Sequence, residues 1–461
     1  MKLKNYFVSA VLAVSLTACQ QHQELLIHVP APSRPAGQQD MVGFAAAPID
    51  TVRVGIIGLG MRGPGAVKRM TQIEGVRISA LCDLNEEGVK KAQNILTEAG
   101  KPAAAEYYGD VNCWRKLVER DDLDLVYIVT DWKNHAPMAK YAMECGKHAA
   151  VEVPAAPSLA ELWDLINTSE RTRKHCMMLE NCVYDFFELT TLNMAQKGLF
   201  GEIIHAEGGY IHTLDEFWDM YWSDWRMRFN RENRGDVYPT HGIGPVCQVL
   251  NIHRGDRMTR LVSMDTHSWR GKELWEKKYG PIPEGEPDFQ NGDHTMTMIQ
   301  TEKGKTILIE HDVMTPRPYD RLYQLTGTKG FADKYPVQGF MFSADGTGAP
   351  VEVENLSAHK FVPDAVRDKL LEEYKHPITR ELEESAKRVG GHGGMDYIMD
   401  YRLIYCLRNG LPLDMDVYDL AEWSCLVELS RISLEHGGAP VEIPDFTRGA
   451  WNKQQGLSFA L

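Results

Sequence analysis

The sequence predicts two domains: an amino-terminal α/β domain with a doubly wound parallel sheet, and an α+β domain with a large, mainly antiparallel sheet. Three observations support this fold class. The chain of 461 residues exceeds the usual size of one domain. Buried-strand and helix patterns alternate in the first part of the chain, as in parallel sheets. Later segments resemble strands separated by turn residues, and helix patterns follow them.

The first 19 residues are arranged like a secretory signal. Lys2 and Lys4 precede an apolar run at 7–16, which is too short to span a membrane. Residues 16–19 resemble the bacterial lipobox, so we expect lipidation at Cys19 and anchoring in the cell envelope, on the periplasmic side or at the cell surface. Ordinary signal cleavage nearby is the alternative. Residues 20–49 are rich in Gln, Pro and Ala and predict a flexible tether.

The composition limits the partners. The formal net charge is -14 and no basic cluster could neutralise phosphates, which argues against nucleic acid. Of the nine cysteines, the eight that follow Cys19 form no CxxC pair, and those in apolar segments resemble buried thiols. A small neutral or polar substrate is expected, and a homo-oligomer is compatible with the sequence.

A GxGxxG pattern follows the first strand pattern. Residues 51–59 resemble a buried parallel strand, and Gly58, Gly60 and Gly63 precede a helix. Glycines allow a tight turn and close backbone approach, and the helix amino terminus attracts a pyrophosphate. A second strand ends at Asp83, whose carboxylate can bind ribose hydroxyls and repel a 2'-phosphate. We therefore expect a Rossmann domain over 50–178 that binds NAD rather than NADP; a glycine turn beside a structural aspartate is the alternative.

The alternation continues with strands at 123–130 and 148–153 and helices at 136–145 and 159–172. Ligands of such sheets bind beyond the carboxyl ends of the strands. Further cofactor contacts are therefore expected at Met61, Arg62, Trp132, Asn134, His135, Glu152, Val153 and Asn181. Each of them could instead be a loop or helix-cap residue.

Residues 179–461 are expected to form the substrate domain. Segments at 202–212, 294–301 and 306–313 predict an antiparallel sheet, and 396–407 and 418–434 predict amphipathic helices near the carboxyl end. Trp218, Trp222 and Trp225 stand at helical spacing, which is more typical of a core than of a sugar platform. Tyr210 and Arg226 are expected to contact the ligand, because a lone polar end needs a partner.

The segment GDVYPTHGIG at 235–244 contains the strongest candidates for catalytic residues. Tyr238 and His241 flank the rigid pair Pro239 and Thr240 and can supply an acid and a base, and the glycines permit close approach of a ligand. A structural histidine is the alternative. Weaker candidates are Tyr184, Tyr319 and His392. HExxH, GxSxG and P-loop motifs are absent, and a paired-carboxylate glycosidase would leave the glycine loop unexplained.

Several motifs together resemble glycoside hydrolase family 109, a branch of the Gfo/Idh/MocA oxidoreductase superfamily. They are the glycine loop with Met61 and Arg62, WKNH at 132–135, EVPAA at 152–156, LENCVY at 179–184 and YPTHGIGPVCQ at 238–248. The resemblance extends from about residue 42 to the carboxyl terminus. It implies a glycosidase that removes terminal α-linked N-acetylgalactosamine from glycans and keeps its NAD bound through turnover.

The resemblance also implies a redox-assisted mechanism, an exception to the two-carboxylate scheme. NAD takes hydride from C3 of the sugar, a base removes the C2 proton, the aglycone leaves C1, water adds, and the hydride returns. Tyr238 and His241 would form the proton-transfer pair, with Tyr184 and His392 as helpers. The sugar would be held by Tyr210, Arg226, Tyr238, Pro239, Thr240, His241 and Tyr319.

The dehydrogenase relatives typically carry Glu-Lys-Pro where this chain has Glu152, Val153 and Pro154. Because valine cannot transfer a proton, the ordinary dehydrogenase route lacks its lysine. A net sugar dehydrogenase and a non-catalytic glycan-binding lipoprotein are the alternatives.

Overall fold

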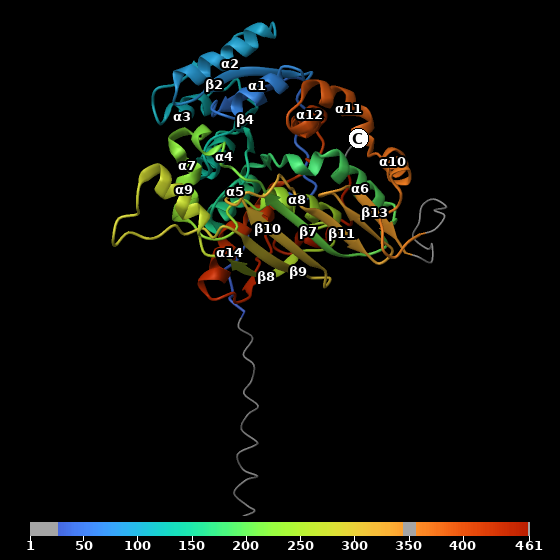
Figure 1. Cartoon of the computed structure of the whole chain (residues 1–461). Helices are drawn as coiled ribbons and strands as arrows, with labels where there is room; N and C mark the ends of the chain where they lie inside the picture. The colour runs from blue at the N-terminus through green and yellow to red at the C-terminus, as the bar shows by residue number, and fades with distance from the viewer. Residues whose placement is uncertain (1–25, 344–355, 460–461) are drawn as a thin grey trace, which may run out of the picture.

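The computed structural model describes residues 26–343 and 356–459, which form two domains (Figure 1). The predicted signal sequence, Cys19 and residues 20–25 lie outside the described residues. Within the described ranges, no helix has the length and apolarity needed to cross a membrane.

The first domain is built on a six-stranded sheet whose strands all run parallel, in the order β3-β2-β1-β4-β5-β6. Its strands are β1 (Val52–Ile57), β2 (Val76–Cys82), β3 (Ala105–Tyr107), β4 (Leu125–Ile128), β5 (His148–Val151) and β6 (Cys176–Met178). Its helices are α1 (Gly63–Met70), α2 (Glu86–Glu98), α3 (Cys113–Val118), α4 (Trp132–Glu144) and α5 (Leu159–Thr172). The strand order reverses between β1 and β4, and such a switch point opens a ligand-binding crevice beyond the carboxyl ends of the strands.

The second domain contains an eight-stranded sheet in the order β13-β12-β11-β7-β10-β9-β8-β14. Among the pairs of named strands in the described part of this sheet, only β7–β10 is parallel. Its strands are β7 (Ile203–Ile211), β8 (Met258–Asp265), β9 (Thr295–Thr301), β10 (Thr306–Asp312), β11 (Tyr323–Gly327), β12 (Gly330–Asp333), β13 (Gly339–Phe342) and β14 (Val441–Glu442). Both parts of the predicted fold class are therefore confirmed.

Helices lie between this sheet and the first domain (Figure 1). The helices of the second domain are α6 (Phe186–Gln196), α7 (Trp225–Glu232), α8 (Thr240–Val249), α9 (Arg270–Tyr279), α10 (Asp364–Glu373), α11 (Pro377–Val389), α12 (Met395–Asn409), α13 (Val417–Ser424) and α14 (Leu426–Glu435). The single helix expected over 418–434 is wrong, because the chain forms α13 and α14 in succession.

The flexible tether expected over 20–49 is also wrong for its described part. Ile27 forms a β-bridge with Val441 of β14, and Arg34 binds Glu170 of α5 at 3.0 Å. Met41 is buried, and its backbone N–H donates to the Tyr418 hydroxyl. The segment thus packs on both domains, since its few apolar and charged side chains each find a specific partner that composition cannot reveal.

Candidate active site

The glycine loop after β1 has the backbone geometry that a dinucleotide requires. Gly58 has φ of +94°, and a Cβ there would lie 2.3 Å from the Val129 carbonyl oxygen. A Cβ at Gly63 would lie 2.1 Å from the Gly58 carbonyl oxygen. A Cβ at Gly60, in contrast, would have no heavy atom within 4 Å. Gly58 and Gly63 therefore serve the turn and the packing of the helix, while Gly60 leaves room for a ligand.

The loop is held from the next strand. Asp83 follows β2, and its carboxylate accepts the Leu59 N–H at 2.5 Å and the Asn85 N–H at 2.8 Å. The cap of α1, Arg62, makes no side-chain hydrogen bond to the helix, so the first N–H groups of the helix stay open to a phosphate. These features fit NAD, with Asp83 at the position that contacts a ribose in this fold. Met61 is 42% exposed beside the open Gly60.

Arg62 links the loop to the second domain. Its guanidinium lies 3.6 Å from Glu152 and 3.5 Å from Asp396, and it contacts His392 at 3.2 Å. Asn181 is buried and donates to Asp396 at 2.6 Å. The structure therefore brings predicted cofactor residues and the glycine-rich segment around His392 into one network. His392 itself has φ of +44°, a left-handed conformation that costs energy in a residue other than glycine.

Three residues at the start of α4 have different surroundings. Trp132 is buried and stacks on the Tyr238 ring at 5.4 Å between centroids. His135 is buried, and its two ring nitrogens lie 2.8 Å from the Pro154 carbonyl oxygen and 3.0 Å from that of Thr130. Burial lowers the pKa of His135, and a neutral imidazole has a single N–H, so the ring donates to one of these two carbonyl oxygens and lies between the two loops that carry them. Asn134 is exposed and donates to Asp131, and Val153 is buried.

Tyr238 and His241 form a hydrogen-bonded chain with a third residue. The Tyr238 hydroxyl lies 3.1 Å from His241 Nε2, and His241 Nδ1 lies 2.6 Å from Glu180 Oε1. Glu180 is fully buried and follows β6. Because a carboxylate only accepts, it fixes the imidazole with the proton on Nδ1 and leaves Nε2 to accept from the phenol. The arrangement can carry a proton between Tyr238 and His241.

Burial and the nearby positive charge of Arg321 lower the pKa of His241 to about 4, although Glu180 opposes them. Burial raises the pKa of Tyr238 well above its usual value, with the Arg226 guanidinium acting in the other direction. Burial also favours a higher pKa for Glu180, but His241 and the Cys182 N–H hold it below the usual value. Near neutral pH the chain is therefore carboxylate, neutral imidazole and phenol.

Glycines position the Glu180–His241–Tyr238 chain by close backbone packing. The glycines of segment 235–244 were expected to admit a ligand, yet a Cβ at Gly242 would lie 2.5 Å from the Gly209 nitrogen, and a Cβ at its partner Gly208 would lie 2.2 Å from the Gly242 carbonyl oxygen. They allow α8 to lie directly on β7 instead. This contact places His241 5.4 Å from the Tyr210 ring at the end of β7.

Aromatic rings and arginine side chains surround Tyr238 and His241. The Arg226 guanidinium lies 4.6 Å from the Tyr238 ring centroid and 5.9 Å from that of Tyr210. The Arg321 guanidinium lies 5.3 Å from the Tyr210 ring centroid and 5.3 Å from that of Tyr319, which is 41% exposed. Pro239 caps α8, and Thr240 begins it as a fully buried residue. Four of the predicted sugar contacts, Tyr210, Arg226, Tyr238 and His241, thus share one cluster.

Two expectations fail here. Tyr184 is fully buried, and its hydroxyl donates to Asp414, which is paired with Arg402 at 2.8 Å. No hydrogen bond or ring contact of the described residues joins Tyr184 to Tyr238 or His241.

The three tryptophans, Trp218, Trp222 and Trp225, do not share a helix. Trp218 is buried, but Trp222 is 68% exposed in a turn where Ser223 and Asp224 have left-handed backbone conformations. Helical spacing alone did not detect this break.

Glu180 and Arg321 belong to the site but were not predicted from the sequence. Glu180 lies two residues after the end of β6, the last strand of the first domain's parallel sheet, where ligand-facing loops begin, and this position was the available signal. Arg321 lies 141 residues further on, and nothing in its local sequence indicates the site.

Glu180, Cys182 and His241 have the residue types of metal ligands, and their ligand atoms lie within 4.8 Å of one another. However, the Arg321 guanidinium donates to the Cys182 sulfur, and a second cation there would be repelled.

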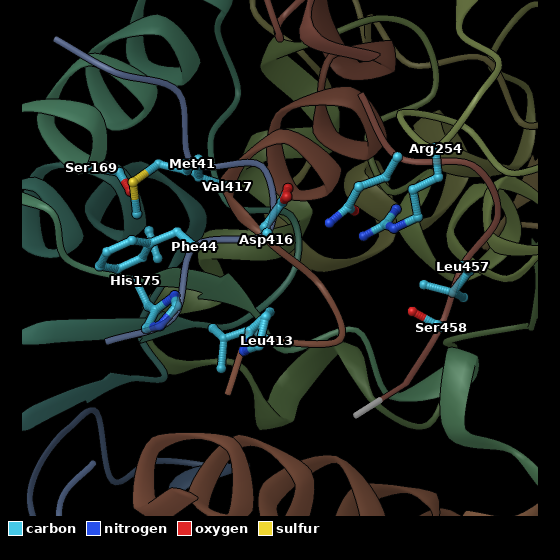
Figure 2. Close-up of a pocket in the computed structure, with 14 residues that line it drawn as sticks. Met41, Phe44, Ser169, His175, Arg254, Leu413, Asp416, Val417, Leu457 and Ser458 are labelled. Carbon is cyan, nitrogen blue, oxygen red and sulfur yellow. The ribbon is translucent and has the colours of Figure 1, made fainter. Parts of the chain in front are cut away.

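A separate cavity of about 130 Å³ lies between the amino-terminal segment, α5 and the carboxyl-terminal residues. Figure 2 shows Met41 and Phe44 on one side of it and Arg254 on the other. Arg254 donates to both oxygens of Asp419, at 2.8 and 2.7 Å. No residue predicted to bind sugar or cofactor lines this cavity.

Two family models match the chain. One, described as Glycosyl hydrolase 109, C-terminal domain, matches residues 184–453. The other, described as Oxidoreductase family, NAD-binding Rossmann fold, matches residues 52–180. A glycosyl hydrolase family 109 protein of Phocaeicola vulgatus is 64% identical over 447 residues, 96% of this chain and 94% of that protein. Another, from Porphyromonas gingivalis, is 61% identical over 458 residues, 98% of this chain and 97% of that protein.

Solved structures share the fold at low identity. An NAD binding oxidoreductase from Klebsiella pneumoniae has a TM-score of 0.63 at 15% identity, over 86% of this chain and all of that chain. A levoglucosan dehydrogenase solved with NADH and levoglucosan also has a TM-score of 0.63, at 18% identity over the same shares.

Proposed function

This chain belongs to glycosyl hydrolase family 109, and from that premise we propose that it is an NAD-dependent α-N-acetylgalactosaminidase that acts on glycans. The observation that carries the proposal is the buried chain of Glu180, His241 and Tyr238 beside the crevice of an NAD-binding Rossmann domain. A glycosidase that used two carboxylates alone would have no need of that domain.

The glycine loop and Asp83 would hold the dinucleotide, with Arg62 and Glu152 beside it. When bound, NAD would accept a hydride from C3 of the sugar while the proton of the C3 hydroxyl is released to water, and both would be returned later, so that NAD is not consumed. The residue after Glu152 is Val153, which is buried and can neither donate nor accept a proton. Proton transfer therefore falls to Tyr238 and His241.

Tyr238 and His241 act as one acid–base unit. The Tyr238 oxygen takes the C2 proton while its own hydroxyl hydrogen passes to His241 Nε2, and Glu180 stabilises the imidazolium through Nδ1. The aglycone oxygen leaves with the electron pair of the C1–O bond. After water has added to C1, the same pair returns a proton to C2. Tyr210 and Tyr319 offer ring faces to the sugar, and Arg226 offers unpaired N–H groups.

The test uses purified, NAD-loaded protein and p-nitrophenyl α-N-acetylgalactosaminide, with p-nitrophenol release and NADH absorbance at about 340 nm followed together. Steady release without net NADH is the expected result. The fold is shared with a levoglucosan dehydrogenase, which makes a net sugar dehydrogenase the second candidate. No release, combined with NADH accumulation from free sugar, would establish that candidate instead.

The acid limb of kcat/KM is expected near pH 4. His241 must be neutral to accept the phenolic proton, and its lowered pKa of about 4 keeps it neutral in the range where an exposed histidine is already protonated. As the pH falls through that value the imidazole gains a proton and the activity is lost. A pH–rate profile, with circular dichroism to confirm folding at each pH, measures the limb.

Glu180→Gln serves as the control for this assignment. The variant removes the charge that supports the protonated imidazole, so the limb should move to lower pH while kcat falls. A wild-type limb near the ordinary histidine value, or an upward shift in Glu180→Gln, would contradict the assignment of His241 as the titrating base.

A further inference from the structure

Two buried arginines of the site lack a carboxylate partner. Arg226 and Arg321 are 6% and 5% exposed. Arg226 donates through Nη1 to the Tyr221 hydroxyl, and its Nε and Nη2 have no hydrogen-bond partner. Arg321 donates through Nη1 to the Cys182 sulfur, and its Nε is likewise unpartnered. No ion pair joins either residue to a carboxylate among the described parts of the chain.

The other buried arginines of the described residues each pair with a carboxylate. Arg69 binds Asp400 at 2.6 Å, Arg254 binds Asp419 at 2.7 Å, and Arg402 binds Asp414 at 2.8 Å. A buried charge is costly unless it is paired and hydrogen-bonded, which explains these three pairs. Arg226 and Arg321 are therefore the exceptions to this pairing of buried arginines with carboxylates, and both lie in the candidate active site. Their uncompensated positive charge favours the binding of a negatively charged group there.

The neighbours of Arg321 do not supply that charge. They are the phenols Tyr210 and Tyr319, whose ring centroids each lie 5.3 Å from the guanidinium, and the thiol of Cys182. Burial raises the pKa of the Cys182 thiol well above its usual value, so this group is neutral near pH 7. The backbone next to Arg321 is fixed, because Asp320 exchanges two backbone hydrogen bonds with Ile211, at 2.8 and 2.9 Å, at the end of β7.

We propose that Arg321, assisted by Arg226, stabilises the enolate that forms when the C2 proton leaves the 3-keto sugar. This inference rests on the proposed function, which supplies the ketone through its nicotinamide oxidant. When the C2–H bond breaks, the proton goes to the Tyr238 oxygen and the electron pair spreads onto the oxygen at C3. That pair then returns to form the C1–C2 double bond, the C1–O bond breaks, and the aglycone oxygen leaves with its electrons. No electron is gained or lost in this step.

Fixed positive charge of this kind acts on the transition state more than on the ground state, because the neutral sugar carries no charge for it to meet. Arg321 is thereby a catalytic residue rather than a ground-state anchor. Its loss should slow proton abstraction while leaving the binding of neutral sugar nearly intact.

The experiment compares Arg321→Met with Arg321→Lys in the NAD-loaded protein, using p-nitrophenyl α-N-acetylgalactosaminide that carries hydrogen or deuterium at C2. Arg321→Met should lower kcat by roughly 10²- to 10³-fold, with little change in KM. Its C2 isotope effect should exceed that of the wild type, because proton abstraction becomes rate-limiting. Arg321→Lys keeps the charge and should recover part of the rate. An unchanged isotope effect in a slow Arg321→Met, or an unchanged rate, would overturn the proposal.

Stability separates this role from a structural one. Since Arg321 has no ion pair to lose, Arg321→Met should unfold at the same temperature as the wild type or higher. Arg254→Met, the matched control, leaves Asp419 buried and unpaired and should unfold at a lower temperature. A large loss of stability in Arg321→Met would assign the residue a structural role and overturn the proposal.

A binding measurement keeps the inference testable if the glycosidase assignment fails. Ascorbate is a planar sugar-like anion whose charge lies on an enediol oxygen, and it can be titrated by calorimetry against wild type and Arg321→Met. At least about tenfold weaker binding by the variant, with N-acetylgalactosamine binding unchanged, supports an anion-stabilising site. Equal affinities, or no binding to either protein, would overturn it. Absence of p-nitrophenol release by the wild type would instead refute the proposed function alone.

Discussion

Tyr238→Phe is expected to lower kcat by roughly 10²- to 10⁴-fold, the range typical of losing a positioned acid–base group. The change removes only the hydroxyl, which lies 3.1 Å from His241 Nε2. The ring stays packed on Trp132 and under Arg226, so KM and the fold should be nearly unchanged. Steady-state kinetics with p-nitrophenyl α-N-acetylgalactosaminide measures the effect.

Tyr374→Phe is the matched control for Tyr238→Phe. Tyr374 caps α10, which packs on β13 rather than on the site, and loss of its hydroxyl should leave kcat as in the wild type. Calorimetric titration with NAD would confirm that Tyr238→Phe still binds the cofactor. A Tyr238→Phe variant that keeps more than about a tenth of the wild-type kcat would refute its role in proton transfer.

Gly60→Val is expected to weaken NAD binding by about 100-fold or more while leaving the melting temperature of the unliganded protein unchanged. No protein atom lies within 4 Å of a Cβ at this position, so the side chain costs nothing in the free protein. A bound dinucleotide would approach the same space, and a steric cost of about 3 kcal/mol corresponds to about 100-fold in affinity. NAD titration by calorimetry and thermal unfolding without NAD measure the two effects.

Gly58→Ala distinguishes blocked binding from a damaged loop. Its φ of +94° and the 2.3 Å approach to the Val129 oxygen predict a loss of about 2 kcal/mol or more in the free energy of unfolding. It should therefore melt at a lower temperature even without NAD. Wild-type affinity in Gly60→Val would show that the dinucleotide does not pass over this glycine.

The first domain could be predicted from the sequence because the patterns that specify it are local. A buried strand followed by Gly58, Gly60 and Gly63 needs only the chemistry of adjacent residues to specify a turn, and the structure has that turn. Tyr238 and His241 were also identifiable, since they are only three positions apart, with Tyr238 just before the cap of α8 and His241 in its first turn, and so stay together whatever the rest of the chain does. Export and lipidation at Cys19 stay predictions from the sequence.

Other features depended on partners distant in the chain. The segment at 26–49 has the composition of a tether, yet Arg34 meets Glu170, and Met41 meets Tyr418. Tyr184 has the residue type of a proton donor, but folding buries it against Asp414. Composition and residue type do not predict such contacts, because they carry no information on which surface a segment will contact in the folded protein.

The fold class, the glycine loop and the Tyr238–His241 pair could be predicted from the residues alone, because strand and helix periodicity and glycine dihedral angles act over a few residues. Two further features became visible in the folded chain: Glu180 orients His241, and Arg321 lies beside Tyr210 without a carboxylate partner. The state of a buried ionisable group depends on its burial and on the charges a few ångströms away, and here these come from the loop after β6, the first turn of α8 and the segment that precedes β11.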